Sequence, residues 1–155
     1  MNLNDLKLQI ELIPESTMHL NLRNQFTSYQ WRQFSQDIQR RDQYTCCICE
    51  RVKGDTIDKL HCHELWTFDN QTQVQSLTGF QSLCFQCHMI KHIGFATMKD
   101  WVEKYQLIEH FCTVNQVSRK QYAQHFHEAV QLWIARNQIK WHVDLGDYNK
   151  LSNDT

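Results

Sequence analysis

Apolar residues recur at helical spacing after residue 28 of the chain. Trp31, Phe34 and Ile38 lie three and four residues apart with polar residues between them, as on one face of an α-helix. The pattern therefore predicts a helix from about Ser28 to Asp42, with its apolar face packed against the rest of the protein.

Two capping patterns predict helices in the C-terminal third of the chain. Thr97 with Asp100 resembles a capping box, and so does Ser118 with Gln121. Each is followed by an apolar stripe: Trp101, Tyr105, Ile108 and Cys112 after the first, and Tyr122, Phe126, Val130 and Trp133 after the second. Two further helices are therefore expected, packed on each other and on the centre of the fold.

Strands are expected in three shorter segments. The N-terminal "LQIELIP" could be a strand that ends at Pro14, and "LHCHELW" has the composition of a strand followed by the loop "DNQTQ". Near the C-terminus, "WHVDL" could be a strand or an extended segment packed back on the body. Residues 84–92 suit a helix closed by Gly94 as a C-terminal cap. The predicted fold class is α+β and mainly helical.

The length and composition favour a single folded domain. A chain of 155 residues with 41% hydrophobic and 12% aromatic residues can bury a substantial core. Four Gly and one Pro are few for an all-β chain with many turns. We divide the chain into an N-terminal extension at 1–27, a core at 28–95, and a C-terminal helical region at 96–155 packed on that core.

Charge and hydropathy limit the partners and the location of the chain. The formal net charge is −1, so a nucleic-acid partner would have to be met by a local basic patch. No apolar run approaches the roughly 20 residues of a membrane span, and the first residues lack the features of a signal peptide. We expect a soluble cytoplasmic protein with no membrane partner, in which clustered cysteines are metal ligands rather than disulfides.

Metal-binding side chains are concentrated in two short segments. Residues 46–66 and 83–92 hold six of the seven cysteines and four of the nine histidines. The pairs "CCIC", through Cys46 and Cys49, and "CFQC", through Cys84 and Cys87, have the spacing of zinc knuckles, in which two thiolates point at one ion. Together these four cysteines predict a structural zinc site, with a hairpin and a loop inserted between the pairs.

The remaining candidate ligands are too many for the same ion. His88 and His92 are four residues apart, so on a helix they share a face about a quarter turn from the cysteines. On the predicted strand, His61 and His63 share one side, whereas Cys62 points away unless a bulge intervenes. A second group of ligands beside the zinc site is therefore predicted.

The order of these residues resembles that of a known nuclease family. It runs CxxC, a strand ending in a possible ligand followed by His, a loop, and then CxxCH-x3-H on a helix, over roughly residues 31–94. This is similar to the HNH endonucleases of the ββα-metal (His-Me finger) group that carry a structural four-cysteine zinc. The resemblance implies a treble-clef-like core with zinc knuckles flanked by α-helices. It also implies metal-dependent hydrolysis of phosphodiester bonds in DNA.

The resemblance further implies a role for each position of the motif. His63 matches the general base, which takes a proton from the attacking water and should not bind the metal. Cys62 holds the position of a metal ligand, and His88 and His92 match the other ligands of a second, catalytic divalent metal, which would be Zn2+, Mn2+ or Mg2+. Cys62 is the expected third ligand, with His61 as the alternative, and a thiolate there would favour zinc.

Basic residues near the first cysteine pair are the expected contacts to DNA. They are Arg40, Arg41, Arg51 and Lys53, with Lys91 between the two histidines of the helix. Because the net charge is small, unaided binding to DNA should be weak and salt-sensitive. Sequence specificity is then expected to come from a protein partner or from a surface that the sequence does not reveal.

One position departs from the family pattern and keeps a second function open. Gly79 stands where the family has an Asn that braces the base, and Gly has no side chain for that purpose. The alternative is a zinc-stabilised module that binds nucleic acid or protein without cleaving it. The presence of His63, His88 and His92 favours the nuclease, since a scaffold would need only the four cysteines.

Overall fold

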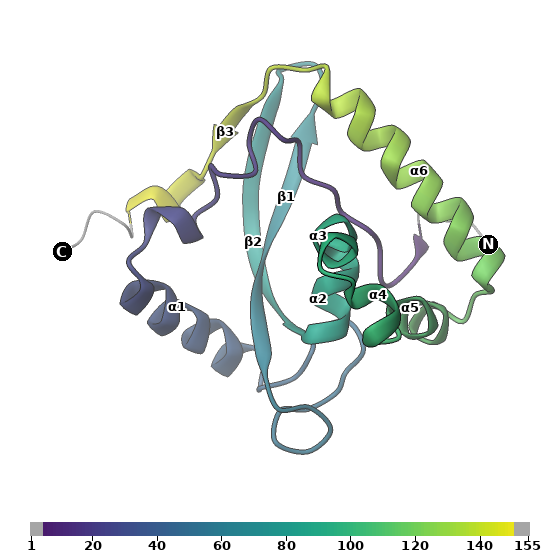
Figure 1. Ribbon diagram of the computed structural model, residues 1–155. Coiled ribbons are helices and arrows are strands. Elements are labelled where there is room, and N and C mark those ends of the chain that lie inside the picture. Colours follow the sequence, from purple (N-terminus) through teal and green to yellow (C-terminus); the bar gives the residue numbers. More distant parts are fainter. Residues whose placement is uncertain (1–4, 151–155) are drawn as a thin grey trace.

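A long antiparallel hairpin forms the centre of the fold (Figure 1). In the computed structural model, which describes residues 5–150, β1 (Leu60–Asp69) pairs along its whole length with β2 (Val74–Cys84). A short third strand, β3 (His142–Asp144), runs parallel to the start of β2. The strand predicted over "LHCHELW", the loop after it and the strand in "WHVDL" are therefore confirmed.

Helices cover both faces of the hairpin (Figure 1). In the described residues they are α1 (Ser28–Arg41), α2 (Phe85–Lys91), α3 (Ile93–Met98), α4 (Trp101–Lys104), α5 (Leu107–Asn115) and α6 (Arg119–Asn137), with short 3-10 turns at Arg23–Gln25 and Gly146–Lys150. One face of the hairpin packs on α1, and α2 packs on the other. The fold is thus α+β, and none of the described helices is long and apolar enough to cross a membrane.

Capping boxes begin the two longest helices. In α1 the Thr27 hydroxyl accepts a hydrogen bond from the Gln30 N–H, and the Gln30 side chain accepts one from the Thr27 N–H. Ser118 and Gln121 form the same reciprocal pair at the start of α6, as predicted. Each box satisfies amide donors that the first helical turn leaves without partners, which fixes where the helix starts.

An aromatic cluster holds α1 against the hairpin. Phe34 lies edge-on to Phe80 of β2, with ring centroids 4.7 Å apart. The fully buried members of the cluster are Leu22, Ile38, Leu77 and Phe80, and Phe26, Trp31 and Phe34 pack around them. The apolar stripe after residue 28 is therefore buried as expected, and it covers the face of β1 that carries Cys62 and Trp66.

Two predicted helix boundaries are wrong, the end of α2 at Gly94 and the single helix after Thr97. In both places the apolar pattern of the sequence continues past a residue at which the helix ends. Gly94 lies inside α3 and does not cap α2, since His92 is the residue that separates the two helices. Asp100 and Gln106 have left-handed backbone, with φ of 56° and 50°, and neither side chain caps a helix. The single helix predicted after Thr97 is consequently divided into α4 and α5.

The N-terminal segment is extended, but the "LQIELIP" strand is not formed. Its backbone groups bond to side chains: Asn115 accepts from Leu8 N–H at 2.9 Å and donates to Leu8 C=O at 2.8 Å, and His125 Nε2 accepts from Ile10 N–H at 2.9 Å. Leu8 and Ile10 are buried in the main core beside Cys46. The first residues described are therefore part of the core and not a peripheral extension.

Asn115→Ala should destabilise the protein by about 2–4 kcal/mol, because two buried backbone groups of Leu8 would lose their partners. Urea denaturation followed by circular dichroism measures this change. Asn137→Ala is the control, since it removes one exposed hydrogen bond, to Glu15 N–H, and should cost well under half as much. Equal effects of the two changes would contradict the structural role given to Asn115.

Candidate metal centres

Four cysteines come together at the start of α2. The sulfur atoms of Cys46, Cys49, Cys84 and Cys87 all lie within 4.8 Å of one another, as required to share a metal ion such as zinc. The first pair sits in a loop that an isolated bridge between Thr45 and Val52 closes, and the second pair spans the junction of β2 and α2. The prediction that these four side chains converge is confirmed.

The other cysteines stay outside this group. Cys47 is exposed and Cys112 is half-buried on α5, and all seven cysteines of the chain are free. The absence of any disulfide agrees with the expectation that the clustered thiols serve as ligands.

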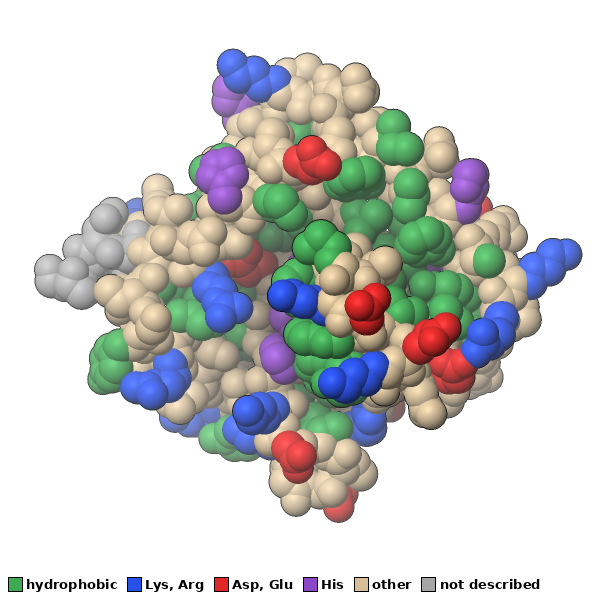
Figure 2. Space-filling model, in the orientation of Figure 1, with side chains coloured by type: hydrophobic (Ala, Val, Ile, Leu, Met, Phe, Trp, Pro, Cys, Tyr) green, Lys and Arg blue, Asp and Glu red, His purple; other side chains and the backbone are tan. Residues whose placement is uncertain are grey.

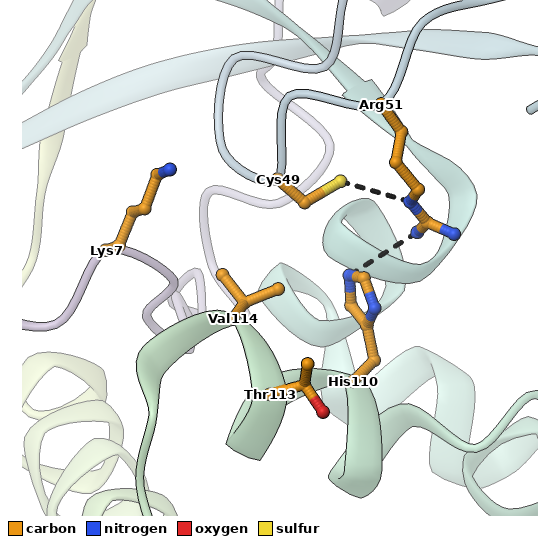
Figure 3. A pocket seen from close by; sticks show the side chains of 6 residues that line it. All are labelled: Lys7, Cys49, Arg51, His110, Thr113 and Val114. Carbon is orange, nitrogen blue, oxygen red and sulfur yellow. Dashed lines mark hydrogen bonds between the residues drawn. The ribbon is translucent and has the colours of Figure 1, made fainter. Parts of the chain in front are cut away.

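Arg51 and His110 lie against the cysteine group, and Figure 3 shows the contacts of Arg51 with Cys49 and with His110. Arg51 lies 3.0 Å from Cys84 Sγ through Nη2 and 3.3 Å from Cys49 Sγ through Nε, while His110 Nε2 lies 3.2 Å from Cys87 Sγ. Hydrogen bonds from Cys46 and the other thiols of the group lower the pKa of Cys49, so a thiolate is favoured there. Arg51, predicted as a DNA contact, is therefore engaged with sulfur, and His110 is a neighbour that the sequence did not reveal.

A second cluster consists of three histidines, which come from β1, from α2 and from the residue after α2. One ring nitrogen of each of His63, His88 and His92 lies within 4.8 Å of the others. The ring centroids are 4.8 Å apart for His88 and His92, 5.1 Å for His63 and His92, and 5.4 Å for His63 and His88. His63 comes from β1, whereas the other two come from α2 and the residue that follows it.

The histidine cluster has the chemistry of a metal site. Burial, together with the charge of His92, lowers the pKa of His88 far below its usual range, and burial and His63 lower the pKa of His92 to about 4. The rings of His88 and His92 are consequently neutral at pH 7, with lone pairs available. Within the described residues, His88 Nδ1 is buried with no hydrogen-bond partner, which is costly unless a ligand occupies the site. Three imidazoles suit zinc and similar transition metals.

Cys62 does not belong to this cluster, so the expected ligand set needs correction. The Cys62 side chain packs in the aromatic cluster under α1, on the other face of β1 from His63. Successive residues of a strand point to opposite faces, and the irregularity in β1 falls between Leu65 and Trp66, beyond the site. Burial also raises the pKa of the Cys62 thiol to about 12. His63, expected to stay off the metal as the base, takes the place of Cys62.

His61 lies beside the three-histidine cluster without joining it. Its ring centroid is 5.0 Å from that of His88, and burial lowers its pKa, so the ring is neutral at pH 7. It lines an open cavity of about 460 Å3, together with Lys59, Phe85, Tyr105 and five other residues. Of the side chains near the cluster, His61 is therefore one that a molecule in this cavity can reach.

Glu11 and Lys91 form a partly buried ion pair beside His63. Lys91 Nζ lies 2.5 Å from Glu11 Oε1, and His63 Nε2 lies 3.0 Å from Glu11 Oε2. Burial alone would raise the pKa of Glu11, but the hydrogen bond with His63 and the charge of Lys91 outweigh it and lower that pKa to about 2. Lys91 is only 5% exposed, so the predicted contact between this residue and a phosphate is wrong.

The three other predicted DNA contacts do not gather around the histidines. Arg40 and Arg41 end α1, where they pair with Asp37 and Asp42, and α1 covers the face of the hairpin away from His63. Lys53 donates to the Gln39 side chain at 3.3 Å, also on α1. Figure 2 instead shows histidine side chains in a hollow beside α2 and α3, with other Lys and Arg side chains close by.

Comparisons with known proteins leave the site as the main source of functional information. The chain matches no protein-family model, and no significant match is found among curated proteins or among solved structures.

Proposed function

We propose that the chain is a metal-dependent HNH-type endonuclease that hydrolyses phosphodiester bonds in DNA. The observation that carries the proposal is the three-histidine cluster of His63, His88 and His92, which a strand and a helix supply beside a four-cysteine group. This order of elements, hairpin then helix with a zinc group at the junction, supports a ββα-metal core of the treble-clef type. A scaffold held by zinc would need the cysteines alone.

The three histidines would hold the catalytic metal, and the four cysteines would hold a structural zinc. A divalent ion held by imidazoles supplies a Lewis acid for a phosphate oxygen and leaves a coordination position open. Because His63 belongs to the cluster, its lone pair is committed there, and it is a poor candidate for the base. His61, neutral and beside His88, is positioned to take a proton from a water molecule in the adjoining cavity.

The cavity beside His61 fits a stretch of nucleic-acid backbone and a base. Lys59 lines it and can contact a phosphate, while Phe85 and Tyr105 offer aromatic surface for stacking. Few basic side chains surround this cavity, and the chain has a net charge of −1. Binding to DNA is therefore expected to be weak without a protein partner.

A plasmid-nicking assay on metal-loaded protein tests the function and the assignment of the base. His61→Ala should lower nicking by about 10²–10⁴-fold, the usual contribution of a general base, and keep the second metal. His63→Ala should lose both the second metal and nicking. His127→Ala, an exposed position on α6, is the control and should behave as the unmodified protein.

The same assay separates the nuclease from a non-cleaving binding module. The module is favoured by one observation: Gly79 pairs with Leu65 in the hairpin, and only the Leu65 side chain lies near the position of a missing Cβ. No polar side chain at position 79 braces the hairpin. DNA binding without nicking by any of Zn2+, Mn2+ or Mg2+ would establish the module and refute the nuclease, whereas nicking by His61→Ala at full rate would refute the role of His61.

A further inference from the structure

Glu11 is the only carboxylate that touches the three-histidine cluster in the described residues. It comes from the extended N-terminal segment, 52 residues before His63 in the chain, and its Oε2 atom lies 3.0 Å from His63 Nε2. A carboxylate accepts hydrogen bonds, so the Nε2–H of His63 is the donor. The second ring nitrogen, Nδ1, is then left with its lone pair.

The position of Glu11 is fixed from several sides. Its backbone N–H donates to the carbonyl of Lys91 at 3.1 Å, and its Oε1 atom receives the Lys91 ammonium at 2.5 Å. The preceding residue, Ile10, is held by His125 at 2.9 Å. Main-chain and side-chain contacts thus bring the carboxylate to His63 in one orientation, and the buried ammonium of Lys91 supplies the charge that balances it.

Such an arrangement has a known physical effect on a metal-binding imidazole. A carboxylate on one ring nitrogen fixes the tautomer and the ring orientation and makes the other nitrogen a stronger ligand. His63 has this partner, while His88 Nδ1 has no hydrogen-bond partner among the described residues. Of the three histidines, His63 is therefore the one whose ring is oriented in advance by a charged group.

We propose that Glu11 is a positioning residue, which holds His63 as the Nε2–H tautomer and so keeps the lone pair of Nδ1 available to a metal, and that Lys91 holds Glu11. This inference rests on the proposed function for the identity of the site. It also assigns the N-terminal segment a part in the metal centre. The segment would otherwise serve only to fill the core.

The test measures the ring of His63 and metal affinity in protein whose cysteine site already holds zinc. Nitrogen-15 NMR of the metal-free histidine site should show His63 protonated at Nε2, and Glu11→Gln should yield a mixture of tautomers. Calorimetric titration with Zn2+ should show a 10–100-fold weaker second site in Glu11→Gln, the usual loss when such a partner is removed. Glu15→Gln, an exposed position on the same segment, should change neither quantity.

A double variant separates positioning from simple charge balance. If Glu11 serves only to neutralise Lys91, then Glu11→Gln combined with Lys91→Met should restore metal affinity, and this result would overturn the proposal. If Glu11 positions His63, the double variant should stay 10–100-fold weaker. Protonation of His63 at Nδ1 in the unmodified protein, or equal Zn2+ affinity in Glu11→Gln, would also overturn it.

These measurements use no DNA, so the two proposals can fail separately. If the tautomer of His63 and the Zn2+ affinities are as expected but the unmodified protein does not nick plasmid, the nuclease proposal alone is refuted. Normal nicking with an unchanged second site in Glu11→Gln would refute the role of Glu11 alone. A protein that takes up no second equivalent of Zn2+ would refute both.

Discussion

Cys87→Ser should remove the structural zinc and, with it, the cooperative fold of most of the chain. Cys87 is fully buried in the main core, and its sulfur belongs to the four-cysteine group. Structural zinc contributes about 10–16 kcal/mol in small zinc domains, which exceeds the net stability of about 5–15 kcal/mol of an ordinary protein. Zinc content by atomic emission and the unfolding transition by circular dichroism measure the two effects together.

Cys47→Ser is the matched control for this change. It alters a cysteine of the same loop that is exposed and lies outside the group, so stability should change by less than about 1 kcal/mol and the zinc should remain. Retention of one zinc and of an unchanged unfolding transition in Cys87→Ser would show that the four cysteines do not form the structural site. The loop of residues 46–52 and the junction of β2 with α2 would then be held by packing and hydrogen bonds without a metal.

His88→Ala should abolish nicking while leaving the structural zinc and the fold in place. It removes one of three imidazoles from the proposed catalytic site, and a Lewis acid that stabilises charge by several kcal/mol corresponds to a loss of about 10³-fold or more. The four cysteines are untouched, so one equivalent of zinc should remain bound. Plasmid nicking and metal content, measured on the same preparation, give the loss of activity and the number of zinc equivalents that remain bound.

His19→Ala provides the comparison for His88→Ala, because His19 is exposed and far along the chain from the cluster. It should keep two metals and full activity. Two equivalents of zinc in His88→Ala would mean that the histidine cluster does not form a metal site. A loss of both zinc ions with an unfolded protein would mean instead that His88 is needed for the fold, and the same measurement on His92→Ala would then decide the ligand set.

The fold was predictable where short-range interactions decide it. Helices α1 and α6, which each start with a capping box, begin where the sequence predicts. The box is a contact between residues three apart. The stripe of Trp31, Phe34 and Ile38 on α1 is buried against the hairpin as its spacing requires. The helix predicted after Thr97 is interrupted at Asp100 and Gln106, which have left-handed backbone that no local pattern indicates.

The ligands were predictable in kind and only partly in identity. The spacing of the two CxxC pairs was enough to predict that four sulfurs converge, because a two-residue gap lets both thiolates of a pair point at one ion. Strand alternation likewise indicated that His61 and His63 share a side, and the structure follows it. Cys62 is wrong as a metal ligand. The resemblance to the nuclease motif favours it, but its side chain points to the face of β1 away from His63.

The sequence by itself determined α1, α6, β1, the cysteine group and a second group of candidate ligands, since each depends on residues close together along the chain. The tertiary structure alone decided which histidines converge and what surrounds them. Glu11 meets Lys91 across 80 residues, and His110 meets Cys87 across 23. Such contacts arise because burying a charge or a thiolate requires a partner of matching chemistry. The chain can supply that partner from any segment that packing brings near, and no local spacing marks where it will come from.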